Sequence, residues 1–255
     1  GTGYAFVDSI AEFFGMTAET SALSAPVEPN SDDPDAPLAP CTKTSAGSGP
    51  WNTAGTWSPS GVPGAGAVVC IASGHTVTLN VNSASIAELQ VSGTLSLGDN
   101  TARTLTVTGD VTIAASATLD IANFNDTHTV NIGGDLTNDG TFDMNTGSND
   151  MARVVFNGAA NQTVSGGGAT TDFHFITINN TGAANNNIVE FSPTNLTAVA
   201  GFLNDGGGTP DSSLDDGVIK MSGSYPFSNT FFPLAAWTIN SDEGIWINNP
   251  NVTVS

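Results

Sequence analysis

The chain has 255 residues and a formal net charge of −20, from 24 acidic residues against only 4 lysines and arginines. A protein that binds nucleic acid neutralises phosphates with clustered cations, and so does one that binds an anionic membrane surface. We therefore expect no nucleic-acid partner, and no membrane insertion because no apolar run reaches transmembrane length. The four cations are scattered along the chain, at Lys43, Arg103, Arg153 and Lys220.

The rest of the composition is typical of an all-β protein. Glycine is abundant, at 29 residues, together with Thr, Ser, Asn and Asp, whereas Lys, Glu and Arg are scarce. This balance favours many short strands and turns over surface helices. A surface made polar by Thr, Ser and Asn is common in secreted bacterial β-proteins, so we expect an extracellular or cell-surface location.

Residues 1–40 are predicted to form a tether ahead of the β-domain. Residues 4–15 place apolar side chains on one side of an amphipathic helix, and the Pro-rich, acidic stretch 21–40 is typical of an extended linker. The helix either packs on the β-domain of its own chain or docks on a neighbouring subunit, which would make it an assembly element. Its apolar residues are Phe6, Val7, Ile10, Phe13 and Phe14.

The two cysteines, Cys41 and Cys70, favour a disulfide because the composition indicates an oxidising compartment. The alternative is a pair of buried free thiols. Their spacing matches no metal site.

From about residue 67 onward, apolar and polar residues alternate, and short segments repeat. Such repeats, with turns and no helices between strands, predict a β-solenoid in which each coil pairs with the coils above and below. Three pairs of segments superpose, at shifts of 25, 23 and 16 residues: 105–112 with 130–137, 118–122 with 141–145, and 89–95 with 105–111.

The prediction for residues 41–255 is therefore one all-β domain, a parallel β-helix, with an antiparallel β-sandwich as the alternative. In the solenoid, inward apolar residues stack into a continuous core, and we expect Val107, Val111, Val130, Ile132 and Leu136 among them. The domain divides into an N-terminal cap at 41–80, regular coils at 80–200, irregular loops at 201–240 and the last strands at 241–255.

Two stretches resemble known families. The stretch near the start of the β-domain resembles the beginning of a G8-type domain, and residues 154–182 look like a repeat of very large secreted β-helix surface proteins of bacteria. Together they cover about residues 41–200, and they imply a right-handed parallel β-helix outside the cell. The first pattern consists of Trp51 and Trp57, "GVP" at 61–63, an apolar strand at 68–71, "SGHTVTL" at 73–79 and "VSGTLSL" at 91–97.

In this setting Trp51 and Trp57 are interpreted as a cap that covers the exposed first coil, because an open solenoid end must be shielded. G8-type domains are also found in proteins that handle extracellular polysaccharide. The functional alternative for the two tryptophans is therefore a platform for a sugar.

Acidic residues recur at equivalent positions, Asp110 with Asp135 and Asp120 with Asp143. Stacked carboxylates could act as acid and base or bind calcium. The alternative is a solvated turn, or an aspartate bonded to local backbone. The three histidines are isolated and are expected at the surface or in turns. We assign no catalytic, cofactor-binding or metal-binding residue, and calcium is the one candidate cofactor.

The favoured function is structural: a non-enzymatic segment or subunit of an extracellular filament, stalk or adhesin. Head-to-tail stacking with like copies is the expected mode of self-assembly. The alternative is a β-helix that binds or cleaves carbohydrate, with extracellular glycans as its partners.

Overall fold

The computed structural model describes residues 38–98, 101–122, 126–147, 151–204, 214–233 and 239–254. The predicted amphipathic helix and its five assembly residues lie outside these ranges, so that prediction is not addressed. The described chain is all-β, with a single short 3₁₀ turn at Ala54–Thr56. None of the described helical segments is long and apolar enough to cross a membrane.

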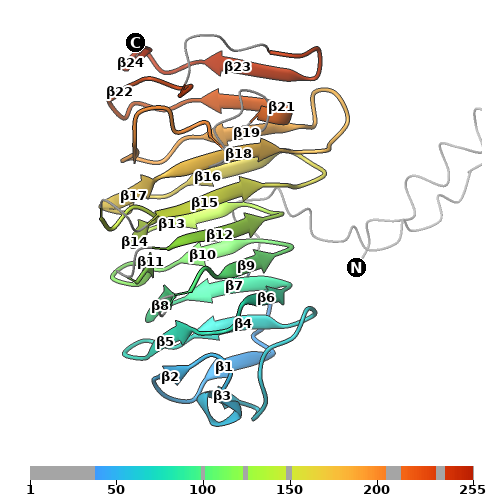
Figure 1. Ribbon diagram of the computed structural model, residues 1–255, viewed down its shortest axis with the longest axis vertical. Coiled ribbons are helices and arrows are strands. Elements are labelled where there is room, and N and C mark those ends of the chain that lie inside the picture. Colours follow the sequence, from blue (N-terminus) through green and yellow to red (C-terminus); the bar gives the residue numbers. More distant parts are fainter. Residues whose placement is uncertain are drawn as a thin grey trace, which may run out of the picture. The chain divides into compact units, whose positions relative to one another are not determined.

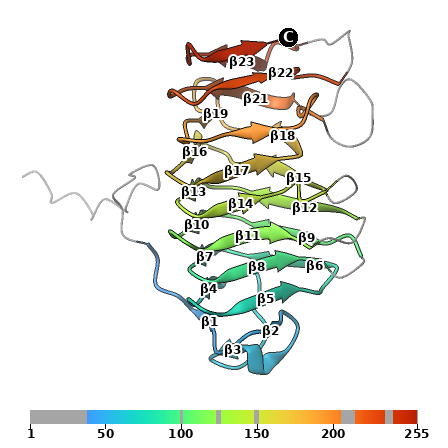
Figure 2. The ribbon, with the colours of Figure 1, turned by 90° about the vertical axis from the view of Figure 1, so that its left-hand side faces the viewer.

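The strands wind into a parallel β-solenoid with three faces (Figures 1 and 2). Face A holds β1 (Lys43–Ser45), β3 (Trp57–Ser58), β4 (Val68–Ile71), β7 (Glu88–Val91), β10 (Val111–Ile113), β13 (Leu136–Asn138), β16 (Gln162–Ser165), β19 (Ile188–Phe191), β21 (Leu214–Met221) and β23 (Glu243–Ile247).

The other two faces complete each coil. Face B holds β2 (Gly49–Pro50), β5 (Thr76–Leu79), β8 (Thr94–Leu97), β11 (Thr118–Ile121), β14 (Thr141–Asp143), β17 (Thr170–Phe173) and β20 (Thr197–Ala198), followed by the separate pair β22 (Phe227–Asn229) and β24 (Val252–Val254). Face C holds β6 (Ser83–Ile86), β9 (Thr104–Val107), β12 (Thr127–Ile132), β15 (Met151–Phe156), β18 (Phe175–Asn179) and the first part of β21.

The alternation in the sequence sets the core. On face A, Leu89 pairs with Val111 and Val111 with Leu136, and all three side chains are fully buried. The five residues predicted to point inward are buried in the same way. Successive side chains of a strand point to opposite faces, so each intervening residue points outward. This explains why the alternate positions are polar. The prediction of a parallel β-solenoid is confirmed, and the β-sandwich alternative is wrong.

Two of the three predicted repeat shifts match the observed register. Val130 pairs with Leu105, and Phe142 pairs with Leu119, as the shifts of 25 and 23 residues require. The shift of 16 residues is wrong, because Leu89 pairs with Val111 and not with Leu105. The matching segments lie on different faces of the solenoid, and all faces share the same apolar alternation and corner glycines.

Buried asparagines hold the corners of the coils. Asn138 accepts a hydrogen bond from the backbone N–H of Gly140 at 3.1 Å and donates to the carbonyl oxygen of Thr170, one coil away, at 2.7 Å. Position 140 requires glycine, because a Cβ there would lie only 2.4 Å from the carbonyl oxygen of Ala117. The amide side chain thus fixes the local turn and ties it to the next coil.

The upper coils differ from the sequence prediction. Irregular loops were predicted over residues 201–240, yet β21 and β22 lie within that range. β21 pairs with β18 through its first residues and with β19 through its last, so it turns from face C to face A. Phe202, Phe227 and Phe231 pack edge to face with centroids 5.1–6.1 Å apart, which continues the apolar core through these coils.

Candidate functional site

The β3 end of the solenoid is closed by the two predicted cap tryptophans. Trp51 and Trp57 are 1% and 2% exposed, and their rings meet edge to face with centroids 4.9 Å apart. The indole Nε1 of Trp57 donates to the carbonyl oxygen of Trp51 at 2.8 Å. This burial removes both residues as platforms for a sugar.

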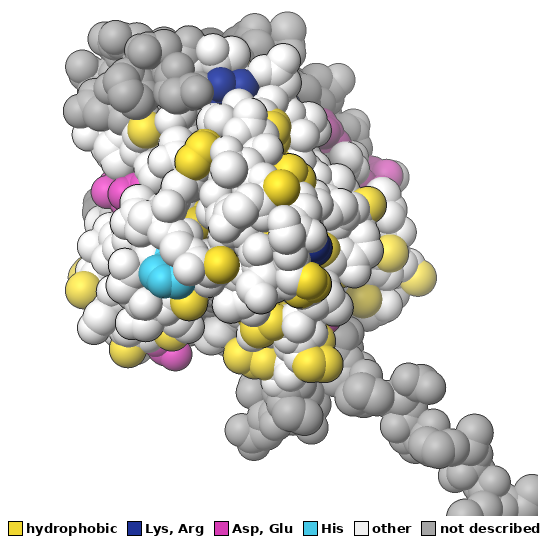
Figure 3. Space-filling view, turned by 90° about the horizontal axis from the view of Figure 1, so that it is seen from below, with side chains coloured by type: hydrophobic (Ala, Val, Ile, Leu, Met, Phe, Trp, Pro, Cys, Tyr) yellow, Lys and Arg dark blue, Asp and Glu magenta, His cyan; other side chains and the backbone are white. Residues whose placement is uncertain are grey.

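The surface of the capped end carries few charges. Seen from below, it shows scattered hydrophobic side chains, with Asp and Glu near the margins (Figure 3). β3 has only two residues and pairs with β1 in the antiparallel sense. The next residue, Pro59, has no N–H to donate. On face A this end therefore offers almost no strand edge to another sheet, whereas β6 on face C pairs with β9 alone.

A disulfide joins Cys41 to Cys70 in β4, with Cα atoms 5.8 Å apart, as predicted. The segment before Cys41 is held as well, because Gln90 Nε2 in β7 donates to the carbonyl oxygen of Ala39 at 2.7 Å. The first coils are thus covalently fixed to the chain that leads into them.

A column of carboxylates runs along the outer side of face B. Asp120, Asp143 and Asp172 lie in register on β11, β14 and β17. Adjacent strands are about 4.8 Å apart, so each carboxylate stands beside the next. The equivalence of Asp120 and Asp143 was predicted, but Asp172 was missed. A "Thr-x-Asp" triplet at 118–120, 141–143 and 170–172 is the sequence signal that could have found it.

Polar neighbours surround the last of these carboxylates. Asp172 accepts hydrogen bonds from Thr197 Oγ1 at 2.8 Å and from Asn145 Nδ2 at 3.3 Å. His174 Nδ1 lies 2.8 Å from Asn145 Oδ1. Burial raises the pKa of Asp172, and Asp143 adds to the rise, while its hydrogen bonds and His174 oppose it. Burial lowers the pKa of His174, and Asp172 opposes that shift.

The first carboxylate of the column is also perturbed. Burial raises the pKa of Asp120, the hydrogen bond with Ser96 opposes the rise, and the charge of Asp143 adds to it. Within the described ranges, no three His, Cys, Asp or Glu side chains gather as they would to hold a metal ion. Calcium binding stays a prediction.

The other predicted pair of acids serves the backbone. Asp110 Oδ1 accepts a hydrogen bond from the N–H of Asp135 at 2.8 Å, and Asp135 Oδ1 accepts one from the N–H of Thr163 at 2.7 Å. The structure therefore supports the alternative in which these aspartates bond to backbone. Each carboxylate binds one coil to the next.

The histidines do not form a common site. His75 Nδ1 lies 2.9 Å from Ser45 Oγ beneath the cap, and His174 lies beside the carboxylate column. The expectation that all three lie at the surface or in turns is wrong for His128. That side chain is 1% exposed, and its Nδ1 accepts a hydrogen bond from the backbone N–H of Arg103 at 3.1 Å.

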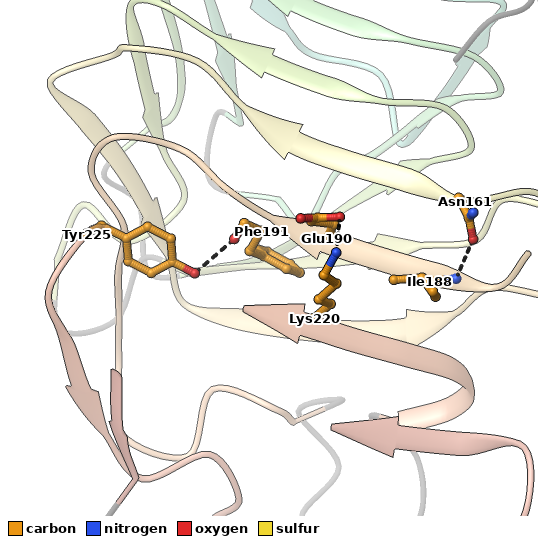
Figure 4. Close-up of polar contacts among 6 residues, drawn as sticks. All are labelled: Asn161, Ile188, Glu190, Phe191, Lys220 and Tyr225. Carbon is orange, nitrogen blue, oxygen red and sulfur yellow. Dashed lines mark hydrogen bonds and ion pairs between the residues drawn. The ribbon is translucent and has the colours of Figure 1, made fainter. Parts of the chain in front are cut away.

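Toward the other end, Glu190 and Lys220 face each other from neighbouring strands of face A (Figure 4). Lys220 Nζ forms an ion pair with Glu190 at 2.7 Å and lies 4.6 Å from the ring centre of Trp246. The three residues are in register on β19, β21 and β23. Although its own burial opposes the shift, the hydrogen bond from Lys220 and the charge of Lys220 lower the pKa of Glu190.

The last described strands keep the inward alternation, and some of their inward side chains are exposed. Ile245 and Ile247 pair with the buried Ile219 and Met221, so they occupy inward positions, yet Ile247 is 39% exposed. Val254, inward on β24, is 55% exposed.

A shallow groove lies beside this end, between residues 196–198 and 226–229, with a volume of about 140 Å³. Pockets for small organic ligands usually have about 300–1,000 Å³. The groove therefore adds no site of ligand size.

These features define the described part of the chain as a parallel β-solenoid whose first coil is capped by Trp51 and Trp57. Residues 42–207 match the model of a family described as a domain of unknown function (DUF8693), and the chain belongs to that family. No curated protein and no solved structure matches the chain significantly. The resemblance to G8-type domains stays a prediction.

Proposed function

We propose that the protein is a non-enzymatic structural segment of an extracellular stalk, filament or adhesin. One observation carries this proposal: the ladders on three faces share one uninterrupted apolar core from the cap to the last coil. Each coil between the first and the last is bonded to two neighbours through backbone hydrogen bonds, so the stack resists bending and stretching without any cofactor.

An extracellular location is supported by the disulfide of the first coils. The disulfide between Cys41 and Cys70 is of the kind that persists in oxidising compartments. A net charge of −20 keeps copies soluble and apart at low ionic strength.

The capped end limits how two such segments could join. On face A, head-to-tail stacking through a continuous ladder needs a free strand edge at the cap, and β3 offers only two residues. We therefore propose that the face A ladder begins at the cap and does not continue into another copy there.

The proposal is tested by labelling intact, unpermeabilised cells of the source with an antibody against the solenoid, followed by immunogold electron microscopy. We expect label on the cell surface, at a fixed distance from the envelope. Label that appears only after permeabilisation contradicts the location.

The mechanical role is tested separately by pulling single molecules from both termini. A structural rod is expected to unfold coil by coil at high force, and reduction of the disulfide is expected to lengthen the first step. Unfolding at low force in one step contradicts a load-bearing role.

A further inference from the structure

A single asparagine of the sequence is followed directly by glycine, in the dipeptide Asn157–Gly158. This dipeptide lies at the corner between β15 on face C and β16 on face A. An asparagine before glycine is prone to deamidation, because glycine has no side chain to hinder attack of its backbone nitrogen on the asparagine amide. The corner therefore contains the elements of a chemical modification site.

The side chain of Asn157 is accessible, but its backbone is held. The residue is exposed, and no hydrogen bond to a described residue holds its side-chain amide. Its backbone N–H donates to the carbonyl oxygen of Ile132, in the preceding coil, at 3.0 Å. Water and hydroxide thus reach the reacting carbon of the side chain without any change in the fold.

Gly158, in contrast, is buried and bonded through both of its backbone groups. Its N–H donates to Oε1 of Gln162 at 2.9 Å, and its carbonyl oxygen accepts from the N–H of Thr181, in the next coil, at 2.9 Å. A Cβ at this position would lie 2.6 Å from the carbonyl oxygen of Gly133, so the packing of the corner requires glycine. The fold therefore places the reactive dipeptide here and at the same time binds its nucleophilic nitrogen.

The acceptor of this hydrogen bond is fixed in the interior. Gln162 is 2% exposed. Its Nε2 donates to the carbonyl oxygens of Ile132 at 3.0 Å and Gly134 at 2.7 Å, and its Oε1 also accepts from Asn180 Nδ2 at 3.0 Å. A side chain anchored at both ends of its amide cannot turn away from Gly158 without breaking several hydrogen bonds.

We propose that Asn157 is a latent deamidation site, kept unreactive by the hydrogen bond from Gly158 to Gln162. In the reaction, the backbone nitrogen of Gly158 loses its proton and forms a bond to Cγ of Asn157. The side-chain nitrogen of Asn157 takes up a proton and leaves as ammonia, so a cyclic imide remains. Water then opens the imide at one of its two carbonyls and leaves aspartate or isoaspartate, of which isoaspartate lengthens the main chain by one carbon atom.

The hydrogen bond blocks this reaction at its first step. The peptide group between the two residues is planar, so any rotation that brings the nitrogen of Gly158 to Cγ of Asn157 carries the N–H away from Gln162. A buried, hydrogen-bonded amide gives up its proton to solvent only when the structure opens locally. Opening of this corner therefore sets the rate of deamidation.

The first test compares the folded full chain with the same chain unfolded in guanidinium chloride, both at mildly alkaline pH. Mass spectrometry of the peptide that contains Asn157 follows the conversion of amide to acid. We expect the unfolded chain to deamidate faster by at least about tenfold, because opening the corner breaks more than one hydrogen bond. Equal rates in the two samples overturn the proposal.

Two leucine variants identify the hydrogen bond. Gln162→Leu removes the acceptor of Gly158 and is expected to raise the deamidation rate of the folded chain by about tenfold. Asn180→Leu is the matched control, because it removes another partner of Gln162 Oε1 and leaves the bond from Gly158 in place. A folded Gln162→Leu chain that deamidates as slowly as the wild type overturns the proposal, and so does an equal acceleration in both variants.

Hydrogen exchange of the wild type needs no variant and decides the matter if Gln162→Leu does not fold. Exchange of the Gly158 amide and deamidation of Asn157 both require the same opening, so folding is expected to slow the two reactions by similar factors. A Gly158 amide that exchanges freely, in a chain whose Asn157 still resists deamidation, shows that the bond to Gln162 is not the protecting contact and overturns the proposal.

Discussion

Asp135 Oδ1 lies 2.7 Å from the backbone nitrogen of Thr163, which belongs to the next coil of the same face. Asp110 makes the same contact one coil earlier, to the backbone nitrogen of Asp135. The turn between faces C and A is therefore held by carboxylates that take the place of a strand partner. This arrangement explains why the acidic residues repeat with the coils.

Asp135→Ala is expected to lower the free energy of unfolding by about 1–2 kcal/mol, because the N–H of Thr163 loses its acceptor. Asp135→Asn is the matched control and keeps a side-chain oxygen in place. Chemical denaturation followed by circular dichroism measures both. Equal losses in the two variants would show that charge, and not the hydrogen bond, is responsible.

Trp57→Ala is expected to destabilise the capped end by about 3–5 kcal/mol, the usual loss for removing a buried aromatic side chain. Trp57→Phe keeps most of the apolar volume but leaves the carbonyl of Trp51 without its donor, so an intermediate loss is expected. Hydrogen exchange should show the effect in β1, β2, β4 and β5. In dilute protein, the exposed Trp246→Phe should change stability by less than about 0.5 kcal/mol.

Replacing both Cys41 and Cys70 by serine is expected to cost about 3–4 kcal/mol, the value for opening a loop of this length in the unfolded chain. The cysteines are separated by 29 residues. Because solenoids can unfold locally, the loss should appear first as faster hydrogen exchange near the cap. Exchange that rises equally in the last coil would contradict this localisation.

Asp120→Asn is expected to stabilise the protein at pH 7. The pKa of Asp120 is raised in the folded state, so its ionised form is disfavoured by folding and the penalty is fully present above the folded pKa. As the pH falls through that pKa toward the unfolded value of 3.8, the wild type takes up the proton and recovers the stability. The advantage of the variant should therefore vanish below the unfolded value of 3.8.

Denaturant unfolding at a series of pH values measures this difference. Asp242→Asn, at an exposed position, is the control and should show a much smaller difference from the wild type. A stability difference for Asp120→Asn that stays constant with pH would mean that packing, and not ionisation, is responsible.

Much of the fold follows from alternation and repeat length. The pairing of Val130 with Leu105 is readable from the sequence, because inward apolar and outward polar residues recur together with the corner glycine. The false match of Leu89 with Leu105 arises from the same features, since strands on different faces obey the same rule. A shift equal to the length of a whole coil relates residues that pair, whereas a shorter shift relates strands on different faces that do not pair.

The site was less predictable. The "Thr-x-Asp" signal was present for Asp172, but the part played by Asn145 and His174 depends on a contact between coils that no local pattern encodes. Trp246 is similar, because its contact with Lys220 depends on the register of β21 and β23 and not on its neighbours in the sequence. Burial of His128 was missed because its strand alternates normally and a polar residue occupies an inward position.

The closed cap also allows folding to proceed from the N-terminal coils toward the C-terminal ones. Trp51, Trp57 and the Cys41–Cys70 disulfide complete the first coils with contacts among residues 38–98. Each later coil can then pair with the strand edges of the coil that has already folded. A chain that emerges N-terminus first from a ribosome or a secretion channel can thus fold progressively, using its own last-formed coil as the template, before its remaining residues are present.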